Sequence, residues 1–127
     1  MNLVDSSAWL EYFADGPNAR FFAPAIENTD ELVVSTINLY EVFKRVVQQR
    51  DETAALQAVA IMEHGKVLDV DERIALSGAR LSSAHRLPMA DSLILATARF
   101  AGAVLWTQDA DFAQIEGVRY RAKPVPA

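Results

Sequence analysis

The sequence contains no cysteine and only two histidines, and both shortages narrow the chemistry open to it. Without cysteine it has no disulfide, thiolate metal site or cysteine nucleophile, which fits a reducing cytoplasm. We place His64 and His85 on helices away from the predicted functional edge described below, and their spacing is not that of a zinc site. We therefore expect neither a histidine general base nor a zinc centre.

Long hydrophobic runs are also missing. No uncharged apolar stretch approaches the ~20 residues that a membrane span needs, and the opening residues Met1 to Asp5 lack the basic region of a signal peptide. The chain has 127 residues, which is enough to bury roughly two thirds of the unfolded surface in one domain. We expect a soluble, cytoplasmic protein with a single domain over residues 1–127, without linkers or repeats.

Basic residues are scarce, since 12 Lys and Arg stand against 17 Asp and Glu and give a formal net charge of −5. Phosphate contacts normally come from Lys and Arg, so this balance alone argues against a nucleic-acid partner. That conclusion depends on where the acids lie.

Short apolar runs alternate with stretches of helical periodicity along the chain. The runs predict strands at residues 3–4, 32–34, 66–70 and 103–107, and one further edge strand fits within 119–127. Helices are predicted around 9–13, 17–26, 39–47, 54–62, 74–85 and 88–101. Apolar strands that alternate with helices favour a parallel sheet covered on both faces. We predict an α/β fold, a three-layer α/β/α sandwich around a short parallel sheet of four to five strands.

Two aspartates follow predicted strands directly. Asp5 comes after Leu3-Val4, and Asp109 comes one residue after the run that ends at Thr107. Ligands of open α/β sheets bind outside the carboxyl ends of the strands, so both carboxylates are candidates for a functional site there. The alternative is that each is an ordinary helix cap or turn former.

Asp91 and Glu41 lie on predicted helices. Asp91 shares a helix face with Ile94 and Leu95, so its carboxylate would be partly buried and would need an arginine or a metal ion as a partner. Glu41 lies opposite the apolar stripe of its helix, where a solvated salt bridge to Lys44 or Arg45 would also explain it. Spacing alone leaves both interpretations of Glu41 open.

The four acids and their surroundings together resemble the PIN-domain nucleases. The matching segments are Asp5-Ser6-Ser7 after the first strand, Ser35 followed by Tyr40-Glu41, Leu87 to Ser92 around Asp91, and Thr107-Gln108-Asp109-Ala110-Asp111-Phe112. The resemblance covers the chain from Leu3 to about Val118. Its length and motif order look like the VapC subgroup, the toxin halves of bacterial toxin–antitoxin pairs.

This resemblance implies a metal-dependent endoribonuclease whose catalytic acids Asp5, Glu41, Asp91 and Asp109 hold Mg²⁺ or Mn²⁺. Hard divalent cations prefer such oxygen ligands, and a bound ion activates water and stabilises charge on the phosphoryl group. Ser7 and Thr107 resemble hydroxyls that orient the acids or a water on the metal, and Ser92 is a further candidate. Asp111 either ligates a second ion or turns the chain.

The resemblance also implies partners. Five aromatic residues between Trp9 and Phe22 exceed what one small core edge needs, and the family places dimer and antitoxin contacts around such helices. We expect a homodimer, a cognate antitoxin protein and an RNA substrate, with no membrane partner. Arg20, Arg86 and Arg99 are candidates for contacts with RNA phosphates. Two divalent ions at the acidic site would neutralise most of the net charge.

Two other interpretations compete with a nuclease. A receiver-type signalling domain has a similar size and an acidic balance, with Asp69 as phosphoacceptor and Lys123-Pro124 as its late motif. It leaves Asp91 and Asp109 unexplained. A non-catalytic RNA-binding module of the same fold is disfavoured because an acidic pocket without metal repels RNA.

Overall fold

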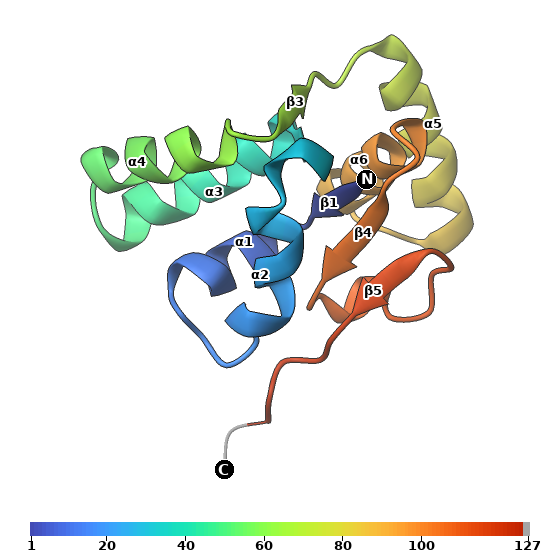
Figure 1. The fold of residues 1–127 in the computed structure, drawn as a ribbon. Helices are drawn as coiled ribbons and strands as arrows, with labels where there is room; N and C mark the ends of the chain where they lie inside the picture. Colours follow the sequence, from blue (N-terminus) through green and yellow to red (C-terminus); the bar gives the residue numbers. More distant parts are fainter. Residues whose placement is uncertain (126–127) are drawn as a thin grey trace.

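The computed structural model describes residues 1–125, within which five strands form one parallel sheet in the order β3-β2-β1-β4-β5 (Figure 1). The strands are β1 (Asn2–Val4), β2 (Leu32–Ser35), β3 (Lys66–Leu68), β4 (Val104–Thr107) and β5 (Val118–Tyr120). The four predicted strands are present, and the expected edge strand is β5. Residues 126–127 of that last prediction lie outside the described residues. The predicted extension of β3 to residue 70 is wrong, since the Val70 amide donates to Thr36 Oγ1 at 3.3 Å.

The helices connect the strands in chain order. They are α1 (Ser6–Phe13), α2 (Ala19–Glu27), α3 (Thr36–Gln49), α4 (Glu52–Met62), α5 (Glu72–His85) and α6 (Met89–Phe100), with short 3₁₀ turns η1 (Thr29–Glu31) and η2 (Ala110–Phe112). Side-chain oxygens of Ser35, Asp51 and Asp71 cap α3, α4 and α5. Figure 1 shows α3 and α4 lying side by side at one end of the molecule. Of the helices in residues 1–125, none combines the length and apolar character needed to cross a membrane.

The sheet buries both of its faces, which confirms the three-layer prediction. Val4, Val34 and Trp106 belong to a core with Trp9 of α1 and Phe22 of α2. The alternate strand residues Leu3, Val33 and Leu105 belong to a second core with Ile94 and Leu95 of α6. Successive side chains of a strand point to opposite faces, so adjacent residues in the middle of these strands are apolar on both faces.

The strand order reverses direction between β1 and β4. The chain moves from β1 to β2 and β3 on one side, and β4 and β5 add on the other side. Val4 pairs with Trp106 in register, and the Asp5 amide donates to the Trp106 carbonyl at 2.8 Å. The carboxyl ends of β1 and β4 are therefore adjacent, and such a reversal is where ligands of open α/β sheets bind.

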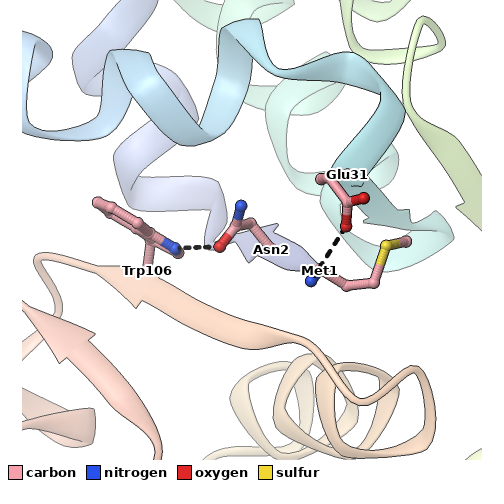
Figure 2. Close-up of polar contacts among 4 residues, drawn as sticks. All are labelled: Met1, Asn2, Glu31 and Trp106. Atoms are coloured by element: carbon pink, nitrogen blue, oxygen red, sulfur yellow. Dashed lines mark hydrogen bonds and ion pairs between the residues drawn. The ribbon is translucent and has the colours of Figure 1, made fainter.

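Polar contacts anchor β1 at its amino end (Figure 2). Trp106 Nε1 donates to Asn2 Oδ1 at 2.9 Å, and the Met1 ammonium group lies 3.3 Å from a Glu31 carboxylate oxygen. These contacts tie β1 to β4 and to η1, and they help to hold the residue that follows β1 in place.

Candidate active site

Asp5 is buried directly after β1, with 3% of its surface exposed. Its Oδ2 accepts hydrogen bonds from Ser7 Oγ at 2.7 Å and Thr107 Oγ1 at 2.8 Å. Burial raises the pKa of the Asp5 carboxyl, and these two hydrogen bonds oppose the shift. Although Asp5 precedes α1, its side chain makes no capping hydrogen bond. Asp5 thus occupies the N-cap position of α1, but its carboxylate accepts from the Ser7 and Thr107 hydroxyls instead of capping the helix.

Glu41 is half-buried on α3 and is positioned by a buried chain of polar groups. Ser6 Oγ donates to Glu41 Oε1 at 2.8 Å, and Asn38 Nδ2 donates to Ser6 Oγ at 2.9 Å. Asn38 Oδ1 in turn accepts from the Ser35 amide at 3.0 Å. This chain turns the Glu41 carboxylate toward the residues that follow β1.

The alternative explanation of Glu41 as one partner of a helix salt bridge is wrong. Among residues 1–125, the one ion pair within 4.0 Å joins Met1 to Glu31, so neither Lys44 nor Arg45 neutralises Glu41. Sequence reasoning missed Ser6 and Asn38. The available signal was that Asn38 lies one helical turn before Glu41 and Ser6 stands next to Asp5.

Asp91 lies half-buried in the first turn of α6. Burial raises the pKa of its carboxyl to about 7, and the negative charges of Asp109, Asp5, Asp111 and Glu41 add to the rise. Of the two partners expected for Asp91, an arginine or a metal ion, the arginine is absent, because no cation of residues 1–125 lies within 4.0 Å of this carboxylate. A partly buried carboxylate surrounded by like charge is costly unless a cation from outside the chain joins it.

Ser92 does not join the acids. Its Oγ donates to the Met89 carbonyl at 2.7 Å, and the residue lines a separate cavity with Met89 and Leu93. Adjacent residues of a helix point about 100° apart, so Ser92 faces away when Asp91 faces the site. The expectation that Ser92 supports the acids is corrected on this ground.

Asp109 and Asp111 lie in the turn after β4. The Asp109 amide donates to Thr107 Oγ1 at 2.9 Å, and Asp109 Oδ1 accepts from the Asp111 amide at 2.9 Å. Asp109 therefore does form the turn that the alternative interpretation expected, and it also faces the acids. Carboxylate oxygens of Asp91, Asp109 and Asp111 lie within 4.8 Å of one another.

One cavity of about 300 Å³ collects these groups, and it is lined by Asp5, Ser6, Ser7, Leu10, Glu41, Arg45, Asp91 and Asp109. The four predicted acids thus meet at the carboxyl edge of the sheet. We call this the acid cavity. Its donor set consists of carboxylate and hydroxyl oxygens, which fits a hard divalent cation such as Mg²⁺ or Mn²⁺.

Other residues selected from the sequence lie elsewhere. Arg20, Arg86 and Arg99 do not line the acid cavity, whereas Arg45 does. His85 ends α5 as predicted, but His64 lies in the turn after α4 instead of on a helix, and both are exposed. Asp69 is exposed after the edge strand β3, and β2 separates that strand from β1. The phosphoacceptor expected for a receiver domain is therefore not part of the acid cavity.

Comparison with known proteins identifies the fold. With 20% identity and a TM-score of 0.78, the chain resembles Mycobacterium tuberculosis VapC20, described as a sarcin-ricin-loop-cleaving toxin; the match covers 95% of this chain and 99% of that one. A Klebsiella pneumoniae toxin–antitoxin complex matches with 23% identity and a TM-score of 0.74, covering 93% and 95%. DNA-bound VapBC from Salmonella typhimurium matches with 20% identity and a TM-score of 0.73, covering 96% and 98%.

A search of curated proteins finds no match. At these identities the solved structures establish a shared fold, which is the α/β architecture predicted from the sequence. The family assignment has separate support, since the family model of the PIN domain matches residues 3–118. That span agrees with the extent of the resemblance noted in the sequence and excludes the receiver interpretation. The chain belongs to the PIN domain family.

Proposed function

We propose that this protein is a metal-dependent endoribonuclease that hydrolyses RNA phosphodiester bonds in the acid cavity. The observation that supports this most is the meeting of Asp5, Glu41, Asp91 and Asp109 in one cavity, with no cation of the described residues within 4.0 Å of their carboxylates. Such a gathering of carboxylates without cations lowers the stability of the fold, and the same carboxylates can ligate a metal ion.

The acids of the site differ in which of them lie close enough to share one metal ion. Asp91, Asp109 and Asp111 offer oxygens close enough to share one ion, and Asp5 and Glu41 face the same space. Ser7 and Thr107 orient Asp5, while Ser6 orients Glu41. When bound, Mg²⁺ or Mn²⁺ supplies Lewis-acid stabilisation of the phosphate and activates water. No protein nucleophile is then required.

The net charge of −5 is compatible with an RNA substrate in this scheme. The acids are concentrated where a divalent ion converts repulsion of phosphate into attraction. With no large excess of basic residues, RNA affinity without metal should be weak. RNA recognition then depends on the ion and on a few nearby cations.

We further propose that the protein is the toxin of a toxin–antitoxin pair, with a cognate antitoxin protein as its partner, and that it acts as a homodimer in the cytoplasm. The support is its likeness in fold to a toxin described as cleaving the sarcin-ricin loop, and to chains from toxin–antitoxin complexes. Light scattering during gel filtration tests the dimer, and a monomer at high micromolar concentration would exclude it. A short DNA-binding protein encoded next to this gene would support the antitoxin.

The test of the enzymatic proposal is cleavage of RNA by the pure protein. We expect cleavage with Mg²⁺ or Mn²⁺, loss of cleavage in EDTA, and loss in Asp5→Asn, Asp91→Asn and Asp109→Asn. Asp69→Asn is a matched control, because it removes an exposed acid outside the acid cavity. If the three variants cleave like the wild type, the assignment is wrong; binding of RNA without cleavage would favour the non-catalytic module.

A further inference from the structure

A second cavity of about 250 Å³ adjoins the acid cavity and has the opposite charge. The two share Ser7, Leu10 and Arg45. The remaining lining residues of the second cavity are Glu11, Ala14, Gln49, Gln108 and Lys123. Two cations, Arg45 and Lys123, thus stand beside a site lined by carboxylates. We call this second space the basic cavity.

Lys123 reaches the basic cavity because the segment after β5 is held against the site. Asn18 is buried, and its Nδ2 donates to Gln108 Oε1 and to the Ala122 carbonyl, both at 3.1 Å. The Arg121 amide also donates to the Thr107 carbonyl at 3.0 Å. Figure 1 shows this segment leaving β5 and passing the connection between α1 and α2. The residue next to the bonded carbonyl is Lys123.

Arg45 stands at the boundary of the two cavities. It follows Glu41 by four residues on α3, so both side chains share one helix face. Arg45 and Lys123 are exposed, and within residues 1–125 neither has a carboxylate within 4.0 Å. The one acid of the basic cavity is Glu11, whose Oε2 accepts from the Asn18 amide at 2.7 Å. Both cations are therefore available to an anion.

We propose that the basic cavity binds a backbone phosphate of the RNA strand beside the bond to be cleaved, through Arg45 and Lys123. This inference rests on the proposed ribonuclease function. A strand whose scissile phosphate enters the acid cavity carries neighbouring phosphates, which the carboxylates repel and which need cations of their own. An acidic protein segment offers similar charge, but its carboxylates gain nothing from continuing into a cluster of acids. The continuity of the two cavities favours RNA.

The experiment measures binding of a fluorescein-labelled, mixed-sequence single-stranded RNA by anisotropy in Ca²⁺, with gels to verify that the RNA stays intact. The proteins are the wild type, Arg45→Gln, Lys123→Gln, the double variant, and Arg80→Gln as a control on the exposed surface of α5. We expect each single variant to weaken binding about fivefold, and the slope of log affinity against log salt to fall by about 0.7 per lost phosphate contact. Arg80→Gln should bind like the wild type.

In the binding assay, two results would overturn the proposal. One is a double variant whose affinity and salt slope equal those of the wild type. The other is binding of a polyglutamate peptide, but not RNA, through Arg45 and Lys123, which would make the basic cavity a protein-docking site. Cleavage assays in Mn²⁺ separate this inference from the proposed function. If the wild type binds RNA through these cations but cleaves none, only the ribonuclease function fails. If it cleaves and the variants leave KM unchanged, only the phosphate site fails.

Discussion

The two ends of the central strand β1 differ in how their polar side chains are paired. At the amino end, Asn2 accepts a hydrogen bond from the Trp106 side chain of β4, and Met1 pairs with Glu31 (Figure 2). At the carboxyl end, Asp5 and its neighbouring acids share one cavity with no cation of the described residues within 4.0 Å. Polar groups that stabilise a fold are paired, so gathered like charges mark a place where stability is given up for ligand binding.

The largest expected effect comes from removing one charge at the carboxyl end. Asp109→Asn should lower metal-dependent RNA cleavage by about 100-fold or more, because it removes a metal ligand that stabilises the transition state. In EDTA the same variant should be at least as stable as the wild type, since it relieves repulsion of Asp91. Cleavage rates and denaturant unfolding measure the two effects. A variant that keeps its activity would contradict the role of Asp109 as a metal ligand. A variant that unfolds more easily in EDTA would contradict the claim that the gathered acids destabilise the fold.

A smaller loss of activity is expected from the group that positions Glu41. Ser6→Ala removes the donor to Glu41 Oε1 and should lower kcat about tenfold with little change in KM. The control is the same change in a Glu41→Gln background, where it should add almost nothing because the group being positioned is already altered. Full additivity of the two changes would show that Ser6 acts in another way.

The pH dependence of stability should reveal the unpaired carboxyls. The pKa values of Asp5, Glu41 and Asp91 are raised in the folded protein, so the folded state holds protons that the unfolded chain releases. In EDTA the free energy of unfolding should therefore fall as pH rises from about 4 to about 7. Because Asp91 is only half-buried, its contribution is on the order of 1–2 kcal/mol.

Urea unfolding in EDTA at several pH values measures this effect. Mn²⁺ should stabilise the protein more at pH 7.5 than at pH 5, because binding to the folded state alone raises its stability and needs ionised carboxylates. A free energy of unfolding that stays constant or rises between about pH 4 and about pH 7 would show that the fold does not disfavour the ionised form of these acids.

The smallest expected effect is at the amino end. Asn2→Ala leaves Trp106 Nε1 without its acceptor and should destabilise the protein by about 1 kcal/mol. Cleavage per folded molecule should remain unchanged, because Asn2 and the acid cavity lie at opposite ends of β1. Chemical denaturation measures the first quantity and a cleavage assay the second. A loss of activity without a loss of stability would show that the two ends are coupled.

The site residues that directly follow a strand could be predicted from the local sequence. Asp5 and Asp109 follow buried strands, and a turn or helix start after a strand places them at the carboxyl edge of the sheet. Glu41 was less predictable, because its partner Ser6 is 35 residues away in the chain and no helical pattern reveals that contact. Ser92 was predicted wrongly, because a neighbour in sequence on a helix points elsewhere.

The sequence does not single out the cation beside the acids. Arg45 lines the acid cavity and was not predicted, whereas contacts of Arg20, Arg86 and Arg99 with RNA phosphates stay a prediction. Nothing in the local sequence around Lys123 indicates its place, since Asn18 holds that segment by donating to the Ala122 carbonyl, 104 residues further along the chain. The predicted end of β3 was also wrong, because Thr36 of another element binds the amide of Val70.

The sequence by itself determined the alternation of strands and helices, the two apolar faces of the sheet and the kinds of side chain available for chemistry. These follow from periodicity and composition, which are local properties. The tertiary structure alone decided which of these side chains meet. The order β3-β2-β1-β4-β5 makes β1 and β4 neighbours and so gathers acids from distant parts of the chain, and the packing of α3 and the last segment sets two cations beside them. Contacts between residues far apart in the chain depend on the strand order and on the packing of distant segments, which no short stretch of sequence encodes.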